Sequence, residues 1–354
     1  MSRSITVLAA LGAAALAAAL GFLPSTGAEV IDTALRALGV ALLLYVLLFI
    51  IAAVSERGMT QRRAESVIGW VFAFPYLLHL ILFQAGAILF SFYLSLFSSD
   101  LLQRHEFIDI DNYRYLFQDE PLFWIAVKHT LIYTLISVPL ATVIALSIAV
   151  LLNQNIKFQG VFRTLFYMPA LVTGVAVAIV WIMVLHPEFG ISAIAFEFFG
   201  LKSPRWFWSE DWALPGLAMI ALWGAGTNML LYLAGLQSIP SQVQEAARID
   251  GASAWQVFFR VTLPLLTPTV FFNVVLNMIG SFQVFTQAFV LTQGGPNNAT
   301  LTMVLLIYRK AFQNFSFGYA SAIAWVLFVV ILIMTFIVFR SSNRWVYYEG
   351  GLRR

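Results

Sequence analysis

Uncharged polar side chains recur at helical spacing within the otherwise apolar segment 264–291. At about 100° per residue they share one arc of a helix, with Gln283 at its edge. Asn277 lies 13 residues beyond Pro264, about 20 Å along such a helix and near the middle of a bilayer. Amides and a hydroxyl placed there suit hydrogen bonding to sugar hydroxyls, although they also suit hydrogen bonds between helices. The arc predicts a solute pathway formed by Asn273, Asn277, Gly280, Ser281 and Gln287.

The apolar segment 214–236 contains a second group of small and polar residues, within LWGAGTNMLLYLAG. Gly224 and Gly226 have no side chain, so a ligand or a neighbouring helix can approach their backbone closely. Asn228 adds an amide. We predict that these three residues face the same pathway, with tight helix packing as the open alternative for the glycines.

A polar stretch that begins SQVQEAARIDG separates these two segments. Ser241 and Gln244 have the spacing of a capping box, which predicts a helix that starts at this serine. The same start puts Glu245 in the first turn and Arg248 in the last, where the helix dipole favours each charge. Gly251 is then expected to close the helix in the left-handed conformation.

A second helix is predicted directly after this turn. Ser253 and Gln256 repeat the cap spacing, and the helix is expected to end at Pro264. Three small residues are predicted to form one face that another protein's backbone could approach: Ala247, Gly251 and Ala254. An amphipathic hairpin lying on the membrane surface is the open alternative.

Residues for covalent or metal chemistry are scarce in this sequence. It has no cysteine, and its four histidines are scattered without metal-ligand spacing. It contains neither a G-x-x-x-x-G-K-[ST] phosphate loop nor an H-E-x-x-H motif. We therefore predict no catalytic site, no metal site and no bound cofactor, and the net charge of +3 requires no nucleic-acid partner.

The hydropathy of the chain indicates an all-α integral membrane protein. Of its 354 residues 61% are hydrophobic and only 10% are charged. Every Asp, Glu, Lys and Arg lies outside eight long uncharged runs, as expected for membrane spans, because a charge at the bilayer centre is costly. The runs predict about eight transmembrane helices at 5–23, 37–54, 68–97, 130–152, 164–185, 214–236, 264–291 and 319–339.

Lys and Arg are distributed unevenly between the connections of these runs. Connections on one side hold 12 Lys or Arg in 70 residues, and those on the other hold 8 in 100. Since the richer side is usually cytoplasmic, both termini and the polar stretch are predicted to be cytoplasmic. Arg309 and Lys310 run against this trend. The run 5–23 is expected to be retained; its cleavage as a signal peptide would leave the later spans in the same orientation.

The sequence EAARIDGASAWQVFFRVTLP resembles the EAA loop of binding-protein-dependent ABC import permeases, which reads EAA, three residues, G, nine residues and I-x-L-P. Val261 replaces the isoleucine of that pattern, a conservative change. Further segments resemble the carbohydrate-uptake, maltose-type branch of the family: 110–117, 162–190, 235–240, 290–312 and 314–328. The resemblance implies that these positions couple the permease to an ATPase: Glu245, Ala246, Ala247, Gly251, Leu263 and Pro264.

The resemblance also implies how the chain is organised. A six-helix permease core at 68–340, with its coupling loop at 241–264, would follow two extra N-terminal transmembrane helices at 1–67 and precede a cytoplasmic tail at 341–354. The implied partners are a homologous second permease subunit, two cytoplasmic ABC ATPase subunits that use the ATP, an extracytoplasmic solute-binding protein and membrane lipid. Substrate contacts are implied near Asn228.

We therefore expect a multi-pass permease subunit of an ABC importer in a bacterial cytoplasmic (inner) membrane. It would move a sugar or related polar solute by alternating access and would not be an enzyme. An ion-coupled secondary transporter is the first alternative, which the lack of Asp, Glu and Lys within the spans disfavours. A membrane-embedded enzyme is the second, and it would need a titratable cluster at one membrane face, which the sequence does not show.

Overall fold

The computed structural model describes residues 45, 61–99, 105–154 and 156–347. The chain divides into two compact units, Met1–Ser91 and Phe92–Arg354. The described part of the first unit contains α3 (Gln61–His79), a π-helical segment η1 (Leu80–Ala85) and the start of α4 (Gly86–Ser95). The predicted spans 5–23 and 37–54 lie outside the described residues, apart from Tyr45.

In the second unit the described residues form helices and one small antiparallel pair, β1 (Phe97–Ser99) and β2 (His105–Phe107). Its first helices are α5 (Asp111–Gln118), α6 (Pro121–Leu152), α7 (Gln159–Tyr167), η2 (Met168–Leu171), α8 (Gly174–Val184) and α9 (Ile191–Phe198). They are followed by α10 (Glu210–Ala221), η3 (Leu222–Gly224), α11 (Ala225–Gln237), α12 (Ser241–Ile249), α13 (Ala254–Val257) and η4 (Phe258–Thr262). The last are α14 (Leu263–Phe282), α15 (Thr286–Leu291), α16 (Met303–Tyr308), η5 (Arg309–Gln313) and α17 (Phe317–Trp345).

Within the described ranges, five helices are long and apolar enough to cross a membrane: Phe72–Ser95, Pro121–Leu152, Glu210–Gln237, Ala254–Leu291 and Phe317–Trp345. A sixth span results if Gln159–Leu171 and Gly174–Val184, which are bent by 101°, are taken together. The prediction of an all-α membrane protein is confirmed. The predicted number of eight spans stays a prediction, because two of the eight lie outside the described residues, which contain five or six.

The predicted span at 164–185 is not one continuous helix, because it is bent at a break. Pro169 has no backbone N–H to continue an α-helix, and the chain here forms the short 3₁₀ segment η2. Val172 and Thr173 are then extended, with ψ of 136° and 143°. The indole Nε1 of Trp223 donates to the carbonyl of Pro169 at 2.9 Å, which satisfies one acceptor that the broken helix leaves free.

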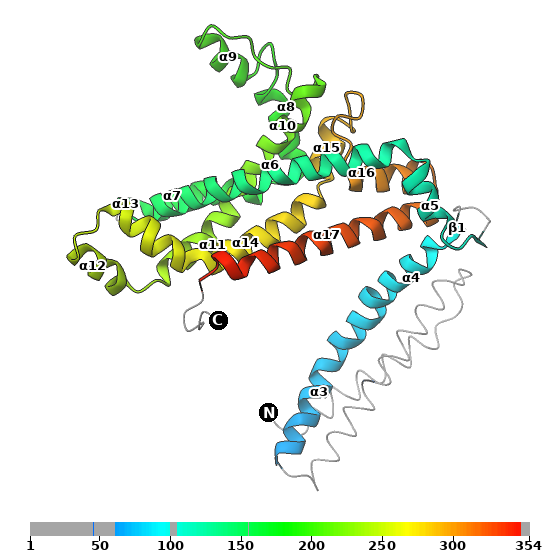
Figure 1. Ribbon diagram of the computed structural model, residues 1–354, viewed down its shortest axis with the longest axis horizontal. Coiled ribbons are helices and arrows are strands. Elements are labelled where there is room, and N and C mark those ends of the chain that lie inside the picture. Colours follow the sequence, from blue (N-terminus) through cyan, green and yellow to red (C-terminus); the bar gives the residue numbers. More distant parts are fainter. Residues whose placement is uncertain (1–44, 46–60, 100–104, 155, 348–354) are drawn as a thin grey trace, which may run out of the picture. The chain divides into compact units, whose positions relative to one another are not determined.

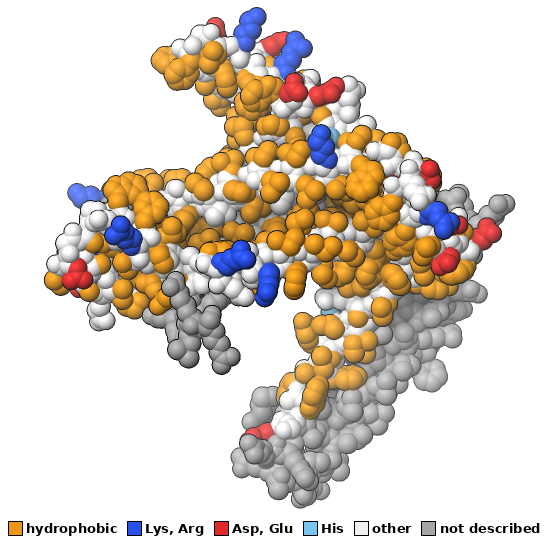
Figure 2. Space-filling view, in the orientation of Figure 1, with side chains coloured by type: hydrophobic (Ala, Val, Ile, Leu, Met, Phe, Trp, Pro, Cys, Tyr) orange, Lys and Arg blue, Asp and Glu red, His pale blue; other side chains and the backbone are white. Residues whose placement is uncertain are grey.

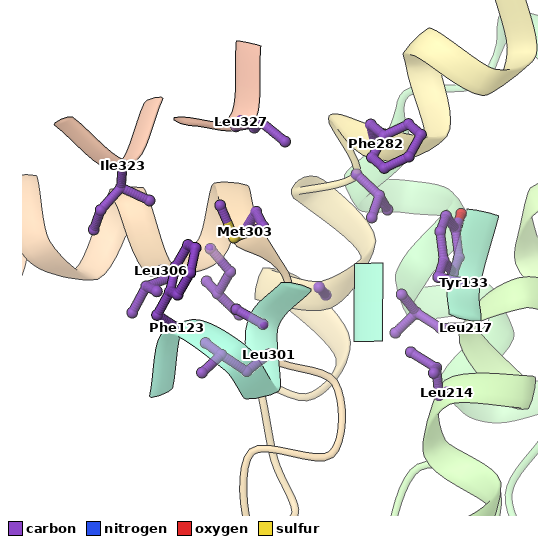
Figure 3. Packing of buried hydrophobic residues seen from close by; sticks show 14 of the residues in the cluster. Phe123, Tyr133, Leu214, Leu217, Phe282, Leu301, Met303, Leu306, Ile323 and Leu327 are labelled. Carbon is purple, nitrogen blue, oxygen red and sulfur yellow. The ribbon is translucent and has the colours of Figure 1, made fainter. Parts of the chain in front are cut away.

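The helices α6, α11, α14 and α17 run side by side, with α12 and α13 at one end and α5 and α16 at the other (Figure 1). Towards the α12 end, Ala145 and Ala149 of α6 are fully buried, and such small side chains let neighbouring backbones approach closely. Towards the other end, larger side chains such as Phe123, Phe282 and Ile323 fill a cluster contributed by several helices (Figure 3).

The two cations that run against the charge trend are both engaged within the chain. Lys310 Nζ lies 2.5 Å from Glu120 Oε2, and both side chains are mostly buried. Tyr319 Oη also donates to this carboxylate, at 3.3 Å. Arg309 Nη1 donates to Asn298 Oδ1 at 3.0 Å. A buried ion pair is favourable only when its remaining polar atoms are satisfied, and the tyrosine helps to meet that condition.

Candidate functional site

The polar stretch folds as the predicted helix–turn–helix. The helix α12 ends at Ile249, and Gly251 takes φ of +84°. The N–H of Ala252 donates to the carbonyl of Ala247 at 3.0 Å, and that of Gly251 to the carbonyl of Arg248 at 3.0 Å. These are the two bonds of a Schellman motif. The prediction that Gly251 closes the helix in the left-handed conformation is confirmed.

The second helix of the hairpin begins as predicted but does not end where expected. Ser253 Oγ accepts from the N–H of Gln256, and Gln256 Oε1 accepts from the N–H of Ser253, so the capping box is present. The predicted end at Pro264 is wrong, because α13, η4 and α14 follow without a gap. The N–H of Leu263 reaches the carbonyl of Phe258, and this wider π-turn precedes a proline ring that would strain an α-helical turn.

Three details of α12 also differ from the prediction. Pro240 occupies the N-cap position and no side chain caps the helix, so the expected serine cap is absent. Glu245 consequently lies beyond the first turn, and the helix dipole does not favour its charge. The predicted small-residue face is wrong, because the left-handed turn at Gly251 separates the helices that carry Ala247 and Ala254.

The hairpin is largely open to its surroundings. A Cβ placed on Gly251 would meet no atom within 4 Å. Ile249 is 86% exposed and Trp255 73% exposed, and the Trp255 ring stacks on Phe259 with centroids 5.8 Å apart. Of the coupling positions, Glu245, Ala246 and Gly251 are exposed, whereas Ala247, Leu263 and Pro264 are partly buried. Exposed apolar side chains grouped in this way mark a surface that another body covers.

A cavity of about 340 Å³ lies between α6, α11, α14 and the start of α15. Six of the eight predicted pathway residues line it: Gly224, Asn228, Asn277, Gly280, Ser281 and Gln287. Gln283, which the sequence placed at the edge of the arc, lines it too. Three arc residues of α14 meet at the cavity as expected, namely Asn277, Gly280 and Ser281. Gln287 reaches the cavity from a separate helix, because residues 283–285 interrupt the span.

The two predicted asparagines of the cavity contact each other. Asn228 Nδ2 donates to Asn277 Oδ1 at 2.9 Å, which joins α11 to α14. Nδ2 of Asn277 is buried and has no hydrogen-bond partner among the described residues. Ser281 Oγ lies 3.0 Å from Thr134 Oγ1 of α6. The polar groups thus bond between helices and still leave a buried donor free.

Two predicted pathway residues lie outside the cavity. Asn273 is 1% exposed and its Nδ2 donates to the carbonyl of Thr269 in the same helix at 3.0 Å. Gly226 is buried, and a Cβ there would overlap the carbonyl of Phe166. For Gly226 the structure therefore favours tight helix packing, whereas Gly224 has open space where its side chain would be.

The sequence prediction missed the contribution of α6 and the start of α15. Tyr133 and Ser137 line the cavity from α6, and Thr286 lines it from α15. Ser137 Oγ is buried without a hydrogen-bond partner among the described residues. The sequence did contain a pattern that could have indicated this polar face of α6, because Thr130, Thr134 and Ser137 recur at helical spacing in an otherwise apolar segment.

Irregular backbone borders the cavity on two sides. Gly224 belongs to the 3₁₀ segment η3 between α10 and α11, and residues 283–285 separate α14 from α15. Backbone of this kind is tolerated at membrane depth only where it is buried in protein or lines a water-filled space. The lining contains no Asp, Glu, Lys, Arg or His. In the described part of the chain no group of three or more His, Asp or Glu could hold a metal ion.

Comparisons with known proteins agree with this geometry. Residues 137–346 match the family described as "Binding-protein-dependent transport system inner membrane component". The chain is 39% identical over 292 residues to the probable ABC transporter permease protein YesP of Bacillus subtilis, covering 81% of this chain and 94% of that protein. It is 34% identical over 280 residues to the multiple sugar-binding transport system permease protein MsmF of Streptococcus mutans, covering 78% and 95%.

A solved structure has a similar fold. It is the crystal structure of a bacterial alginate ABC transporter in complex with an alginate pentasaccharide-bound periplasmic protein, one chain of which matches with a TM-score of 0.67 at 23% identity. The match covers 78% of this chain and 94% of that chain. The family match and the permease relatives favour an ABC permease over the ion-coupled alternative. The chain therefore belongs to the family of binding-protein-dependent transport system inner membrane components, the multi-pass permease subunits of ABC importers.

Proposed function

We propose that this permease passes a sugar or related polar solute through the cavity between α6, α11 and α14. The observation that carries the proposal is the lining, which is rich in amides and hydroxyls and has no charged residue. Asn277 Nδ2 and Ser137 Oγ lack partners among the described residues, and a buried polar atom without a partner is costly. Solute hydroxyls can both donate and accept there. The name of the relative MsmF supports a sugar.

The hairpin is the proposed contact with a separate ATPase subunit, which uses the ATP while this chain binds no cofactor. Docking on a protein is favoured over lying on the membrane because α12 and its turn carry Glu245, Arg248 and Asp250. Helices that lie on membranes are instead rich in Lys and Arg on the polar face. A second permease subunit, a second ATPase and an extracytoplasmic solute-binding protein complete the proposed importer.

The proposed orientation places the hairpin and both termini in the cytoplasm of a bacterium. It rests on the excess of Lys and Arg in the connections on that side. Because the chain has no cysteine, single cysteines can be labelled without background. Positions Arg62, Gly251 and Arg344 should react only from inside, and Asp109, Ser203 and Asn298 only from outside. Labelling of position 251 by an impermeant reagent from outside would contradict the orientation.

Uptake into vesicles tests the function itself. Vesicles that hold the assembled transporter should take up a labelled sugar only with ATP on the hairpin side and binding protein on the other. Ionophores that collapse ion gradients should leave uptake unchanged. Uptake that follows an ion gradient and ignores ATP would restore the secondary-transporter alternative. In this assay Asn277→Leu is the test variant and Asn273→Leu is its matched control, since only Asn277 lines the cavity.

A further inference from the structure

The short helix α9 turns one face towards the protein and leaves the opposite face uncovered. Phe196 lies 6.3 Å from the ring of Trp206, within a buried aromatic cluster. Ile191, Ile194 and Phe198 lie on the other side, within an arc of about 60° at helical spacing. These three side chains are 66%, 65% and 85% exposed. Both faces of the helix are apolar, but only one of them packs against the rest of the protein.

The uncovered face continues into the chain on both sides of α9. Phe189 precedes the helix, Phe199 and Leu201 follow it, and all three side chains are exposed. On the preceding span α8, Ile179 and Met183 are exposed as well. Figure 1 shows α9 projecting away from α6, α11, α14 and α17, and in Figure 2 this region carries apolar side chains together with charged side chains of both signs. The apolar surface is therefore continuous with that of a membrane-spanning segment.

Cations and tryptophans border this apolar face. Lys202 and Arg205 are exposed, and neither forms an ion pair in the part of the chain that the structure describes. Trp208 and Trp212 are roughly half exposed. Tryptophans gather at the level of lipid headgroups, and long cationic side chains extend from apolar surface towards phosphates at the same level.

The position of α9 in the chain also places it at the level of the lipid headgroups. It lies in the connection between α8 and α10, which belong to consecutive spans. Its eight residues extend about 12 Å, far less than the thickness of a bilayer, so it cannot cross. A connection of this kind starts and ends where the membrane meets water.

We infer that α9 is an interfacial anchor, which lies in the plane of the membrane with Ile191, Ile194 and Phe198 among the lipid acyl chains. Lys202 and Arg205 would contact lipid phosphates at its edge. Lipid is the occupant that this surface indicates, because its border combines half-exposed tryptophans with long cationic side chains, as proteins do at the level of lipid headgroups. The anchor would hold the Val184 end of the bent pair Gln159–Leu171 and Gly174–Val184 at a fixed depth.

Fluorescence quenching by labelled lipid tests this position. Ile194→Cys and Phe198→Cys place a label on the uncovered arc, and Glu197→Cys places the same label off the arc as a matched control. Each full-length variant, in the complex with its accompanying subunits, is reconstituted into phosphatidylcholine–phosphatidylglycerol vesicles. A fraction of the phosphatidylcholine carries a nitroxide at a shallow acyl position. Quenching should be several times stronger at 194 and 198 than at 197.

Two results would overturn the inference. Equal, weak quenching at all three positions with water-like emission would show that the face is solvated. Blue-shifted emission at 194 and 198 without quenching would show that protein covers them. A second measurement uses Lys202→Gln with Arg205→Gln, which should reduce quenching at 198 in vesicles containing phosphatidylglycerol more than in vesicles without it. An equal reduction in both lipids would exclude the proposed contact of the cations with anionic phosphate.

Discussion

The hairpin and the cavity are incomplete in opposite ways. In the hairpin, the Schellman bonds and the capping box satisfy backbone N–H and C=O groups at the turn and at the start of α13. Its side chains Ile249 and Trp255, however, are 86% and 73% exposed. The cavity, by contrast, leaves Asn277 Nδ2 and Ser137 Oγ buried without partners among the described residues. The first region lacks apolar cover and the second lacks hydrogen bonds.

Each deficiency indicates the kind of partner that removes it. Apolar area is covered by a second apolar surface, which another protein provides. Unpaired buried polar atoms are satisfied by a ligand with its own donors and acceptors. Substitutions in the hairpin should therefore change assembly, and substitutions in the cavity should change transport by an assembled complex.

The largest effect is expected for Gly251→Val. A β-branched residue is strongly disfavoured at φ of +84°, at a cost of about 1–3 kcal/mol. The turn should then lose its Schellman bonds, and uptake should be nearly abolished together with co-purification of the ATPase. Gly251→Asn is the control, because asparagine tolerates the left-handed conformation and open space surrounds the position. Equal loss in both variants would mean that a close contact, and not the backbone conformation, requires glycine.

Asn277→Leu should reduce uptake in the assembled complex. The change removes a hydrogen-bonding group and leaves Asn228 Nδ2 unpaired, a loss of about 1–3 kcal/mol or roughly 5- to 150-fold. Initial rates of uptake over a range of solute concentrations measure it. Asn273→Leu lies one turn away and outside the cavity, so it should alter stability and leave these rates unchanged. The same kinetic defect in both variants would assign the arc to helix packing.

Ile249→Ala should weaken association with the ATPase by about 1–2 kcal/mol, because it removes apolar area that only a partner covers. The thermal stability of the chain alone should not change, since the side chain is 86% exposed. Titration of the ATPase onto the detergent-solubilised permease measures the effect. An unchanged affinity combined with weaker membrane association would favour a hairpin that lies on the lipid surface.

The smallest effect is expected for Ser281→Ala. Ser281 already bonds to Thr134 on α6, and hydrogen bonds between membrane helices contribute about 0.6 kcal/mol on average. Ser137→Ala is its counterpart, because Ser137 Oγ has no partner in the described part of the chain. Uptake should fall more in the Ser137 variant, while helix association should weaken more in the Ser281 variant. The reverse order would mean that Ser281 contacts the solute and that Ser137 contributes to helix packing.

Local signals predicted the turn and the second cap of the hairpin, whereas they did not predict the breaks in the spans. The turn at Gly251 and the cap at Ser253 depend on residues a few positions apart, so their spacing in the sequence is sufficient. The break at 168–173 contains a proline, whereas the interruption at 283–285 contains neither proline nor glycine and is satisfied by a distant residue, since Thr302 Oγ1 donates to the carbonyl of Val284 at 3.0 Å. Hydropathy alone cannot locate them, because both halves of each broken span remain apolar.

For single residues of the cavity, too, the sequence pattern was not sufficient to predict which side chains line it. Asn273 shares the arc of Asn277, but it lies nearer the end where Ala145 and Ala149 draw the helices together. No space is left beside it, although helical periodicity treats the two asparagines alike. Ser137 was not predicted, because its place in the cavity wall depends on which face of α6 packs towards α11 and α14. Periodicity identifies a face of a helix, and packing along the helix decides which part of that face is open.

The absence of a break at Pro264 has a mechanical consequence. Since α13, η4 and α14 form one uninterrupted helix, Ala254 in the hairpin and Asn277 in the cavity wall lie on a single rod, about 35 Å apart along its axis. A displacement of the hairpin would therefore reach the cavity wall through continuous helix. This helix ends at the interruption at 283–285, beside the cavity, so the displacement would act on the wall itself.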